Sequence, residues 1–232
     1  MKISVIIPCF NEEKTILKIL EKVNLQKKNL QLEIIVSDDG SKDETISLLK
    51  ENSNLYDSLI ESKINRGKGA ALKKGIEIAS GELILFQDAD LEYDPNDYKK
   101  LIEPFLAHGA DVVYGSRFQG SAAHRLIYFS HRVANFILTI LVNLLTNINF
   151  SDVETGYKVF RKSIMKNIKI NENSFGVEIE VTMKIAKLKA KIFEVGIGYN
   201  GRTYNEGKKI TIKDGLIAVF LIFKYFFSSA YR

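Results

Sequence analysis

The regular alternation of short apolar runs with longer amphipathic segments constrains the fold of this chain more than any other feature. Through the first half of the sequence, each run of strand length is followed by a segment whose apolar residues recur at helical spacing. The expected strands are residues 3–8, 32–41, 57–61, 82–87 and 111–116, and the expected helices are residues 12–23, 42–52, 67–80 and 96–109. Repeated strand–helix units of this size predict an α/β fold, with a mostly parallel sheet flanked by helices.

Polar motifs follow four of the expected strands. They read PCFNEE (8–13), DDGS (38–41), QDAD (87–90) and GSR (115–117). In parallel sheets of this kind, ligands bind beyond the carboxyl ends of the strands. We therefore expect these motifs to converge on one edge of the sheet, although they are far apart in the sequence.

The acidic motif after residues 82–87 carries the clearest chemistry. Asp88 and Asp90 are separated by one small residue, and Glu92 and Asp94 follow closely. Two such carboxylates can hold Mg²⁺ or Mn²⁺ and leave positions open for the phosphate oxygens of a substrate. The alternative interpretation is an ordinary acidic loop, but its position directly after a buried strand favours a cation site.

Two weaker motifs suggest a nucleotide. A carboxylate of the DDGS motif at 38–41 could accept hydrogen bonds from a nucleobase or ribose, although a helix N-cap at Ser41 or Asp43 is the stronger interpretation of this motif alone. The segment 67–69, GKG, could bring backbone N–H groups close to phosphate at a helix start. It is no Walker loop, because the pattern G-x-x-x-x-G-K-[ST] is absent from the chain.

Basic residues indicate an anionic partner. The net charge is +5, and Arg117, Arg125 and Arg132 follow the strand at 111–116, while Arg202 and Lys208 form a second group. Guanidinium groups suit phosphate, although a solvated, solubilising surface is the alternative. The chain has no run of five basic residues, and its basic residues do not interleave with aromatic ones, so we expect no nucleic-acid partner.

The second half contains two strongly apolar segments, residues 133–150 and 215–227. Polar residues interrupt the first, and neither offers about 20 clean apolar residues, so we expect no clear transmembrane helix. Each segment could lie in a membrane interface or pack on the core. The first strand begins at residue 3, so we expect no signal peptide, and Cys9 is the only cysteine, which excludes an intramolecular disulfide.

Taken in order, these motifs resemble those of inverting family-2 glycosyltransferases with the GT-A fold. The matching segments are SVIIPCFNEE, VSDDGSKDET, NRGKGAALKKG, LILFQDAD, VVYGSRF, DVETGYKVFRK, FGVEIEVTMKIAK and IFEVGIGYNGRTYNEGKK. Within that family, the chain is most similar to the polyprenyl-phosphate sugar transferases, such as the dolichyl-phosphate mannose synthases and glucosyltransferases. The resemblance extends to about residue 210.

The resemblance implies roles for particular residues. It assigns catalysis to Asp88, Asp90 and Arg117, and a Mg²⁺ or Mn²⁺ ion to Asp88, Asp90 and Glu92. It assigns the nucleotide-sugar to Pro8, Phe10, Glu12, Asp39, Lys68, Asp88, Ala89 and Asp90. It assigns the acceptor phosphate to Arg117, Arg132, Arg202 and Lys208. Glu92 stands where mannose synthases often have glutamine, and Asp152 receives no firm role.

The resemblance also implies an organisation and an activity. We expect one GT-A domain over residues 1–210, with a candidate interface helix at 125–150, and a C-terminal amphipathic membrane-interface helix at 211–232. The expected enzyme is a peripheral one at the cytoplasmic face of the membrane. It would move mannose or glucose from GDP-mannose or UDP-glucose to undecaprenyl or dolichyl phosphate.

Two alternatives stay open. One keeps the donor chemistry but uses a glycan, a glycolipid or a protein as acceptor. The other is a non-catalytic module that binds a membrane surface or a nucleotide on the same scaffold, because a fold alone does not establish an activity. The intact acidic pair and the basic residues argue against the second alternative.

Overall fold

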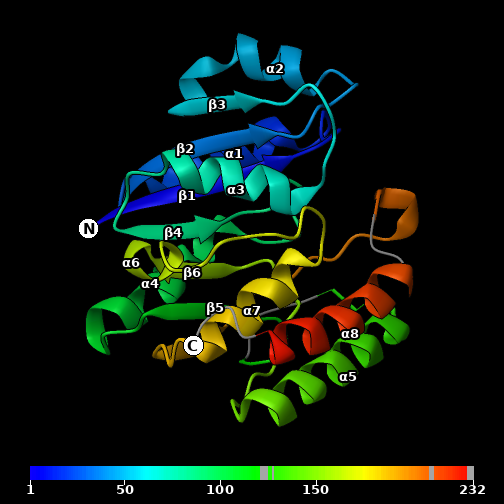
Figure 1. Cartoon of the computed structure of the whole chain (residues 1–232). Helices are drawn as coiled ribbons and strands as arrows, with labels where there is room; N and C mark the ends of the chain where they lie inside the picture. The colour runs from blue at the N-terminus through cyan, green and yellow to red at the C-terminus, as the bar shows by residue number, and fades with distance from the viewer. Residues whose placement is uncertain (121–124, 127, 209–211, 229–232) are drawn as a thin grey trace.

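A seven-stranded, mostly parallel sheet organises the chain (Figure 1). The computed structural model describes residues 1–232 apart from 121–124, 127, 209–211 and 229–232. The strand order is β3-β2-β1-β4-β6-β5-β7, and every neighbouring pair is parallel except the two that β6 makes. The predicted mostly parallel α/β sheet is therefore confirmed.

The strands are β1 (Lys2–Cys9), β2 (Gln31–Asp38), β3 (Ser58–Glu61), β4 (Leu83–Phe86), β5 (Val112–Ser116), β6 (Lys158–Arg161) and β7 (Ile192–Gly196). The α-helices are α1 (Ile16–Gln26), α2 (Thr45–Glu51), α3 (Lys68–Ile78), α4 (Tyr98–Ala107), α5 (Phe129–Thr146), α6 (Lys162–Met165), α7 (Val177–Lys187) and α8 (Ile212–Phe227). Short 3-10 turns are η1 (Ser53–Leu55), η2 (Pro95–Asp97) and η3 (Tyr204–Glu206).

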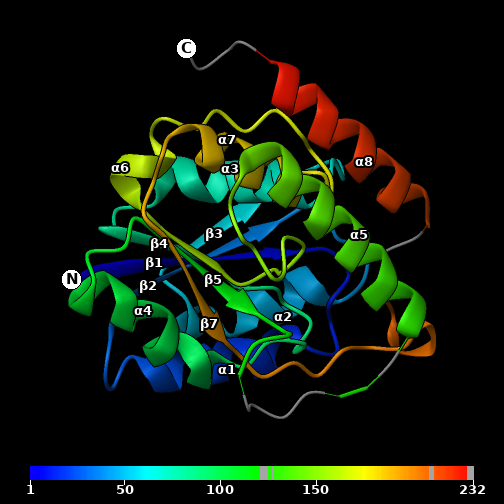
Figure 2. The same cartoon turned by 90° about the horizontal axis from the view of Figure 1, so that it is seen from below.

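Helices cover both faces of the sheet (Figure 2), so central strands such as β1, β4 and β5 are buried on both sides, whereas the edge strands β3 and β7 are only half-buried. Val5 and Ile7 of β1 face one core, to which α1 and α4 contribute, whereas Ile6 faces the other core with α3, α7 and α8. Successive side chains of a strand point to opposite faces, so one strand supplies both cores. This explains why the strands read as continuous apolar runs and lack alternation.

The antiparallel strand β6 departs from the simple strand–helix series. It lies between β4 and β5, with Phe160 paired to Ile84 on one side and to Val112 on the other. The strands β4 and β5 are therefore not neighbours, although no other strand separates them in the sequence. The loops that follow them, at Asp88 and Arg117, lie on either side of the segment that leads into β6.

The helices α5 and α8 pack side by side at one end of the molecule (Figures 1 and 2). Both contribute to the core, α8 through Leu221 and Ile222 for example. Their outer surface is apolar and exposed: Phe129, Val133, Phe136, Ile137, Ile140 and Leu144 on α5, and Leu216, Ile217, Phe220, Phe223 and Phe227 on α8. The predicted boundary at 210/211 falls outside the described residues.

The helix α5 is long and apolar enough to cross a membrane, judged by its length and composition. Only 22% of it is buried, so it differs from an ordinary core helix, and it runs over Phe129–Thr146 and does not extend over the expected 125–150. The sequence-based expectation of no clear membrane-spanning segment therefore did not anticipate how much of α5 lies open. The packing of α5 on α7 and α8 also matters, because it fixes the helix to the sheet.

Candidate active site

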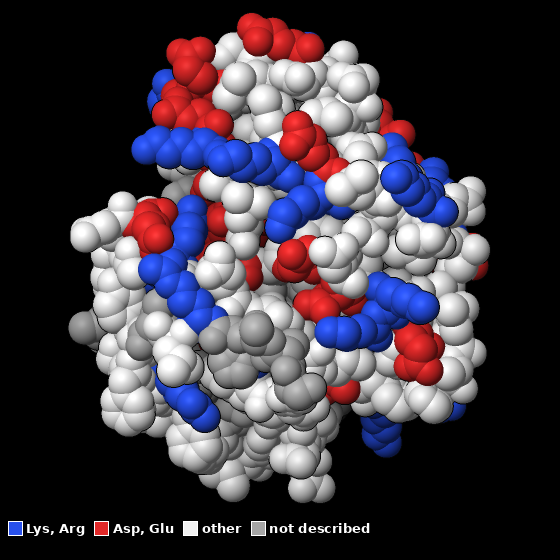
Figure 3. Space-filling model, turned by 180° about the vertical axis from the view of Figure 1, so that it is seen from behind, with Lys and Arg blue, Asp and Glu red and all other residues white. Residues whose placement is uncertain are grey.

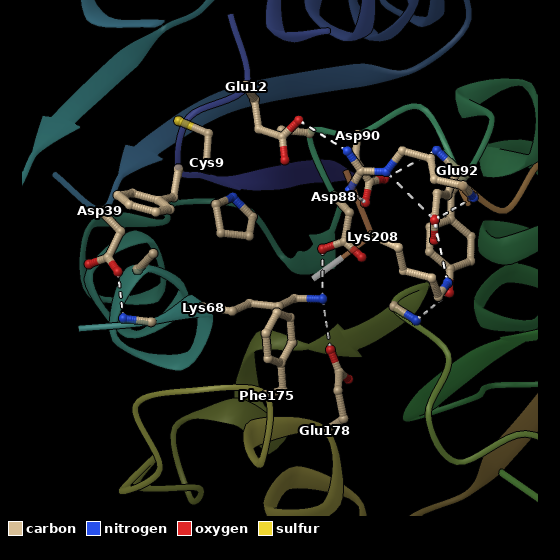
Figure 4. A pocket seen from close by; sticks show the side chains of 18 of the residues that line it. Cys9, Glu12, Asp39, Lys68, Asp88, Asp90, Glu92, Phe175, Glu178 and Lys208 are labelled. Carbon is tan, nitrogen blue, oxygen red and sulfur yellow. Dashed lines mark hydrogen bonds and ion pairs between the residues drawn. The ribbon is translucent and has the colours of Figure 1, made fainter. Parts of the chain in front are cut away.

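The motifs that follow the parallel strands meet in one pocket at the carboxyl edge of the sheet (Figure 4). Of the residues assigned from the sequence, the pocket is lined by Pro8, Phe10, Glu12, Asp39, Lys68, Asp88, Ala89, Asp90, Glu92, Arg117, Arg202 and Lys208. Asp39 lies at one end, Glu92 and Lys208 lie at the other, and Lys68 and Asp88 lie between them (Figure 4). The expected convergence of these motifs is confirmed.

Asp38, the last residue of β2, and Asp39, which follows it, make different contacts. Asp38 shapes the turn, because its carboxylate accepts from the backbone N–H groups of Gly40 and Ser41 at 2.9 and 3.0 Å. Asp39 accepts from the backbone N–H of Arg66 at 2.9 Å and from that of Gly67, both through Oδ2. Its Oδ1 is buried in the pocket wall without a hydrogen-bond partner. This oxygen is free to accept from a ligand N–H or O–H.

The two glycines of the GKG motif allow the start of α3 to pack closely against the backbone of residues 172–173. A Cβ on Gly67 would lie 2.5 Å from the carbonyl oxygen of Asn173, and one on Gly69 would lie 2.2 Å from that of Glu172. Both positions therefore require glycine for α3 to pack against the segment that precedes α7. The φ of Gly67 is 109°, which side chains rarely adopt. The weak phosphate-loop interpretation is not needed to explain these residues.

Lys68 joins the first acid of the pair to α7. Its Nζ lies 2.6 Å from Asp88 Oδ1 and 2.9 Å from Glu178 Oε1, and Figure 4 shows it directed between the two carboxylates. Burial alone would lower the pKa of Lys68, but the two carboxylates outweigh it and raise the pKa above its usual value. Lys68 is therefore a fixed positive charge in the middle of the pocket.

Asp90 lies opposite Arg202, whose Nη2 is 2.6 Å from Asp90 Oδ2. Burial, followed by the charges of Glu92 and Asp88, nevertheless raises the pKa of the Asp90 carboxyl to about 7. Negative charge is thus in excess around the acidic pair. A small divalent cation prefers carboxylate oxygens and would relieve that excess, so Asp88 and Asp90 fit Mg²⁺ or Mn²⁺. Within the described residues, no three acidic, His or Cys side chains gather into a ready-made metal cluster.

Glu92 holds the segment that follows β7. Its carboxylate accepts from the Tyr199 hydroxyl and the Arg202 backbone N–H, each at 2.8 Å, and lies 3.6 Å from Lys208 Nζ. Arg202 in turn reaches Glu12 Oε2 at 3.4 Å. This basic segment therefore covers the acids of the pocket. Metal binding by Glu92 stays a prediction.

Asp152 positions Arg117. Its carboxylate is fully buried and accepts from Nε and Nη2 of Arg117, each at 2.7 Å, and from the Arg117 backbone N–H at 3.0 Å. Asn135 of α5 donates to the same carboxylate at 3.0 Å. This arrangement gives Asp152 the role that the sequence did not provide: it holds the guanidinium at the pocket wall.

Arg132 is the one assigned residue that does not line the pocket. It is exposed on α5, and its guanidinium lies 5.5 Å from the ring centre of Phe118. Arg117 lies 5.7 Å from the same ring, so Phe118 connects the two cations. Acceptor binding by Arg132 stays a prediction, for an exposed residue of α5.

Sequence reasoning missed three charged residues that line the pocket or support it, Glu178, Lys158 and Glu154. Glu178, in the first turn of α7, bonds both Lys68 and the fully buried Lys158. Glu154 lines the pocket in the segment that leads into β6. The segments that contain them, DVETGYKVFRK and FGVEIEVTMKIAK, were the available signal, but neither acid stands in a strand-end motif. Only the fold brings them to the pocket.

The sequence of this chain matches one protein family and several known proteins. The family model described as "Glycosyl transferase family 2" matches residues 4–169. An uncharacterized protein of Methanocaldococcus jannaschii is 33% identical over 88% of this chain and 93% of that protein. A dolichol-phosphate mannosyltransferase of Pyrococcus furiosus is 28% identical over 90% of this chain, which matches 61% of that longer protein.

A solved structure supports the fold. Glucosyl-3-phosphoglycerate synthase from Mycobacterium tuberculosis, solved with Mn²⁺, UDP and glucosyl-3-phosphoglycerate, has a TM-score of 0.75 to this chain. The match covers 97% of this chain and 79% of that one, at 20% sequence identity. At that identity the likeness concerns the fold, and it confirms the predicted GT-A fold.

Proposed function

The chain belongs to glycosyl transferase family 2 and is a hexosyltransferase, and from that premise we propose its donor, acceptor and metal. The proposed reaction moves mannose or glucose from GDP-mannose or UDP-glucose to a polyprenyl phosphate, with Mg²⁺ or Mn²⁺, at the cytoplasmic face of a membrane. One observation carries the proposal. A single pocket contains both an acidic pair with excess negative charge and several fixed cations, beside an exposed apolar surface.

The nucleotide occupies the end of the pocket at Asp39 in this proposal. The free Oδ1 of Asp39 suits a ring N–H, which both uracil and guanine possess. Pro8 and Phe10 line the same pocket and offer apolar surface to a base or ribose. The relatives with solved structures include complexes with UDP and UDP-glucose, which supports a nucleotide-sugar here. The choice between uridine and guanosine follows from the assay below.

The donor's diphosphate lies at Asp88 and Asp90, which would hold the metal. Bound there, the ion would neutralise the charge that develops on the leaving nucleoside diphosphate. Neighbouring structures contain Mn²⁺ or Mg²⁺ together with UDP, which supports a divalent ion in this family. Lys68 lies 2.6 Å from Asp88 and orients that carboxylate.

Arg117, Arg202 and Lys208 receive the acceptor phosphate, together with Arg132 of α5. Arg202 and Lys208 contact pocket acids in the free protein, and phosphate oxygens would take over part of these contacts. Arg117 is already oriented by Asp152, so its guanidinium loses little freedom on binding. Orientation of two anions and stabilisation of charge are then the main work of the protein.

The bond changes need no strong general base. A lipid phosphate is ionised at neutral pH, so one of its oxygens attacks the anomeric carbon directly. A bond forms between that oxygen and the carbon, while the bond from the carbon to the diphosphate oxygen breaks on the opposite side. Inversion at the anomeric carbon results. The exposed apolar surface of α5 and α8 would rest on the membrane and admit the lipid.

The test is a transfer assay with a radiolabelled sugar. Purified protein is incubated with Mn²⁺ or Mg²⁺, undecaprenyl or dolichyl phosphate, and each of a panel of UDP- and GDP-sugars. We expect labelled product in the organic phase with one donor, and none when EDTA is present. Metal-dependent donor binding without a lipid product would reject the acceptor and keep the donor site. Absence of donor binding would reject the whole proposal.

A further inference from the structure

Glu154 lines the pocket, yet the proposed reaction gives it no task. Its Oε1 is buried, and no hydrogen bond to either of its carboxylate oxygens is formed within the described residues. Leaving a buried acceptor unpaired costs about 1–3 kcal/mol. Such a group is expected where a ligand supplies the missing donor.

The neighbouring cations are already committed to other carboxylates. Arg117 is bonded to Asp152 through two nitrogens, and Lys68 bridges Asp88 and Glu178. Lys158 bonds Glu178 and the carbonyl oxygen of Thr155. None of these three cations pairs with Glu154.

The segment that contains Glu154 is fixed on both sides. Thr155 donates through Oγ1 to the carbonyl oxygen of Gly115 at 2.5 Å, and the Gly156 N–H donates to the Tyr93 hydroxyl at 2.9 Å. Asp152, two residues earlier, is held by Arg117. Glu154 cannot move far to find a partner within the protein.

The same segment lies directly against the acidic pair. A Cβ added to Gly156 would come within 2.3 Å of Asp88 Oδ2, so backbone and carboxylate are in contact there. The charges that act most strongly on Glu154 are those of Lys158, Glu178, Arg117 and Asp152, and Asp39 is not among them. If Asp88 and Asp90 hold the diphosphate, the sugar attached to it lies beside Glu154.

Asp39 offers a parallel at the other end. Both residues present a buried carboxylate oxygen without a partner, one at the proposed nucleotide end and one near the acidic pair. A hexose carries several hydroxyl groups that can donate to such an oxygen. Burial, the largest influence, raises the pKa of Glu154 to about 7, as expected where no donor is present.

We propose that Glu154 accepts a hydrogen bond from a hydroxyl of the transferred sugar, and that it favours neutral hexoses over hexuronates. The inference rests on the proposed function, because it assumes a nucleotide-sugar in this pocket. A carboxylate that recognises a hydroxyl would repel the carboxylate of a hexuronate at close range. Glu154 would thus contribute to donor selectivity.

The experiment compares Glu154→Gln with the wild-type protein by calorimetric titration in the presence of Mn²⁺. The probes are UDP, UDP-glucose and UDP-glucuronate, or GDP, GDP-mannose and GDP-mannuronate if the wild type binds only guanosine nucleotides. We expect the Kd of the nucleoside diphosphate to stay unchanged and that of the hexose donor to rise about tenfold. The preference for the neutral hexose over the hexuronate should shrink.

Glu103→Gln is the matched control, because Glu103 is exposed on α4 and does not line the pocket. Unchanged donor affinity and selectivity in Glu154→Gln would overturn the inference and leave the proposed function intact. An equal rise in the Kd of the nucleoside diphosphate and of the nucleotide-sugar would also overturn the inference, because Glu154 would then affect the pocket as a whole and not the sugar. If the wild type binds no nucleotide-sugar, the proposed function and the inference fail together.

Discussion

At the scale of single residues, most charged side chains of the pocket are paired with a group of opposite charge, but two acids are not well compensated. Lys68, Arg117 and Arg202 each contact at least one carboxylate, so the cations are positioned before any ligand arrives. Asp90 and Glu154 remain poorly compensated, and burial raises the pKa of both to about 7. These two residues are therefore where substitutions should separate function from stability.

Asp90→Asn should lower kcat by about 100-fold or more, because an amide is a poor ligand for a divalent ion at a site of developing charge. The fold should persist, since an asparagine oxygen can still accept from Arg202. The measurement is the transfer rate together with the thermal unfolding midpoint. Asp94→Asn is the control, because this residue caps η2 outside the pocket and asparagine caps equally well. Full activity of Asp90→Asn would remove the metal role.

Asp152→Asn should destabilise the protein by about 3 kcal/mol, because it leaves the guanidinium of Arg117, whose side chain is only 16% exposed, without its charge partner. Urea unfolding at neutral pH measures this loss. Asp94→Asn serves again, since it breaks only the exposed pair with Lys22 and should cost about 1 kcal/mol or less. Equal stabilities of the two variants would mean that the Arg117–Asp152 pair contributes nothing beyond a surface pair.

Glu154→Gln should stabilise the metal-free protein, and more strongly at pH 8 than at pH 5. Burial raises the pKa of Glu154 from 4.5 to about 7, so the folded state holds the proton more tightly than the unfolded chain. Stability from this group is present at low pH and is lost as the pH rises towards 7. Urea unfolding in EDTA at both pH values measures the difference between variant and wild type. A difference that does not change with pH would contradict the prediction.

The charge pairs themselves were beyond prediction from the sequence. Arg117 and Asp152 are 35 residues apart, and Lys158 and Glu178 are 20 apart. No local pattern connects such residues, because their contact depends on the position of β6. Asp88, Asp90 and Asp39 could be found because each follows a strand, where parallel sheets place their ligands.

At the scale of secondary structure, the apolar surface of α5 and α8 is the feature with the clearest consequence. Figure 3, which shows the molecule from behind the view of Figure 1, shows charged side chains gathered around a hollow in the upper and middle parts of that side and few in its lower part. Phe136 and Phe220 are 62% and 65% exposed. Such a surface is uncommon on a protein that contacts only water.

Phe136→Ser and Phe220→Ser should each reduce binding to anionic lipid vesicles by about tenfold, because each removes an aromatic side chain from the membrane interface. Vesicle sedimentation measures the bound fraction. Transfer to a short-chain, detergent-solubilised acceptor should be unchanged. Leu106→Ser on α4 is the control, since Leu106 is 72% exposed but lies outside both helices. Unchanged vesicle binding in both phenylalanine variants would exclude this surface as the membrane contact.

The elements of the first half followed from the sequence, whereas several of the second half did not. The strand β6 has four residues and begins with a lysine that is fully buried, so neither apolar alternation nor length identifies it. The helix α7 is buried on all sides from Val177 to Ile185, including Glu178, Glu180 and Lys184. It therefore lacks the amphipathic pattern on which helix prediction depends.

At the scale of the whole molecule, ligand binding should raise the free energy of unfolding. A nucleoside diphosphate at 100 times its Kd should add about 2.7 kcal/mol, or roughly 5–10 °C in Tm for a chain of this size. We expect this shift only when Mn²⁺ or Mg²⁺ is present, because the acidic pair would otherwise repel the diphosphate. Scanning calorimetry with UDP and GDP, with and without EDTA, provides the measurement. An equal rise in Tm in the presence of EDTA would mean that nucleotide binding does not require the metal ion.

The antiparallel strand β6 also sets the width of the site. Neighbouring strands lie about 4.8 Å apart, so β4 and β5, with β6 between them, are separated by about 10 Å. A parallel strand in that place would end at the same edge and send its own loop outwards between Asp88 and Arg117. Because β6 instead begins there, the incoming segment 152–157 forms a floor and leaves the space above it open. The antiparallel direction of one short strand thus leaves open space between Asp88, proposed to bind the donor, and Arg117, proposed to bind the acceptor.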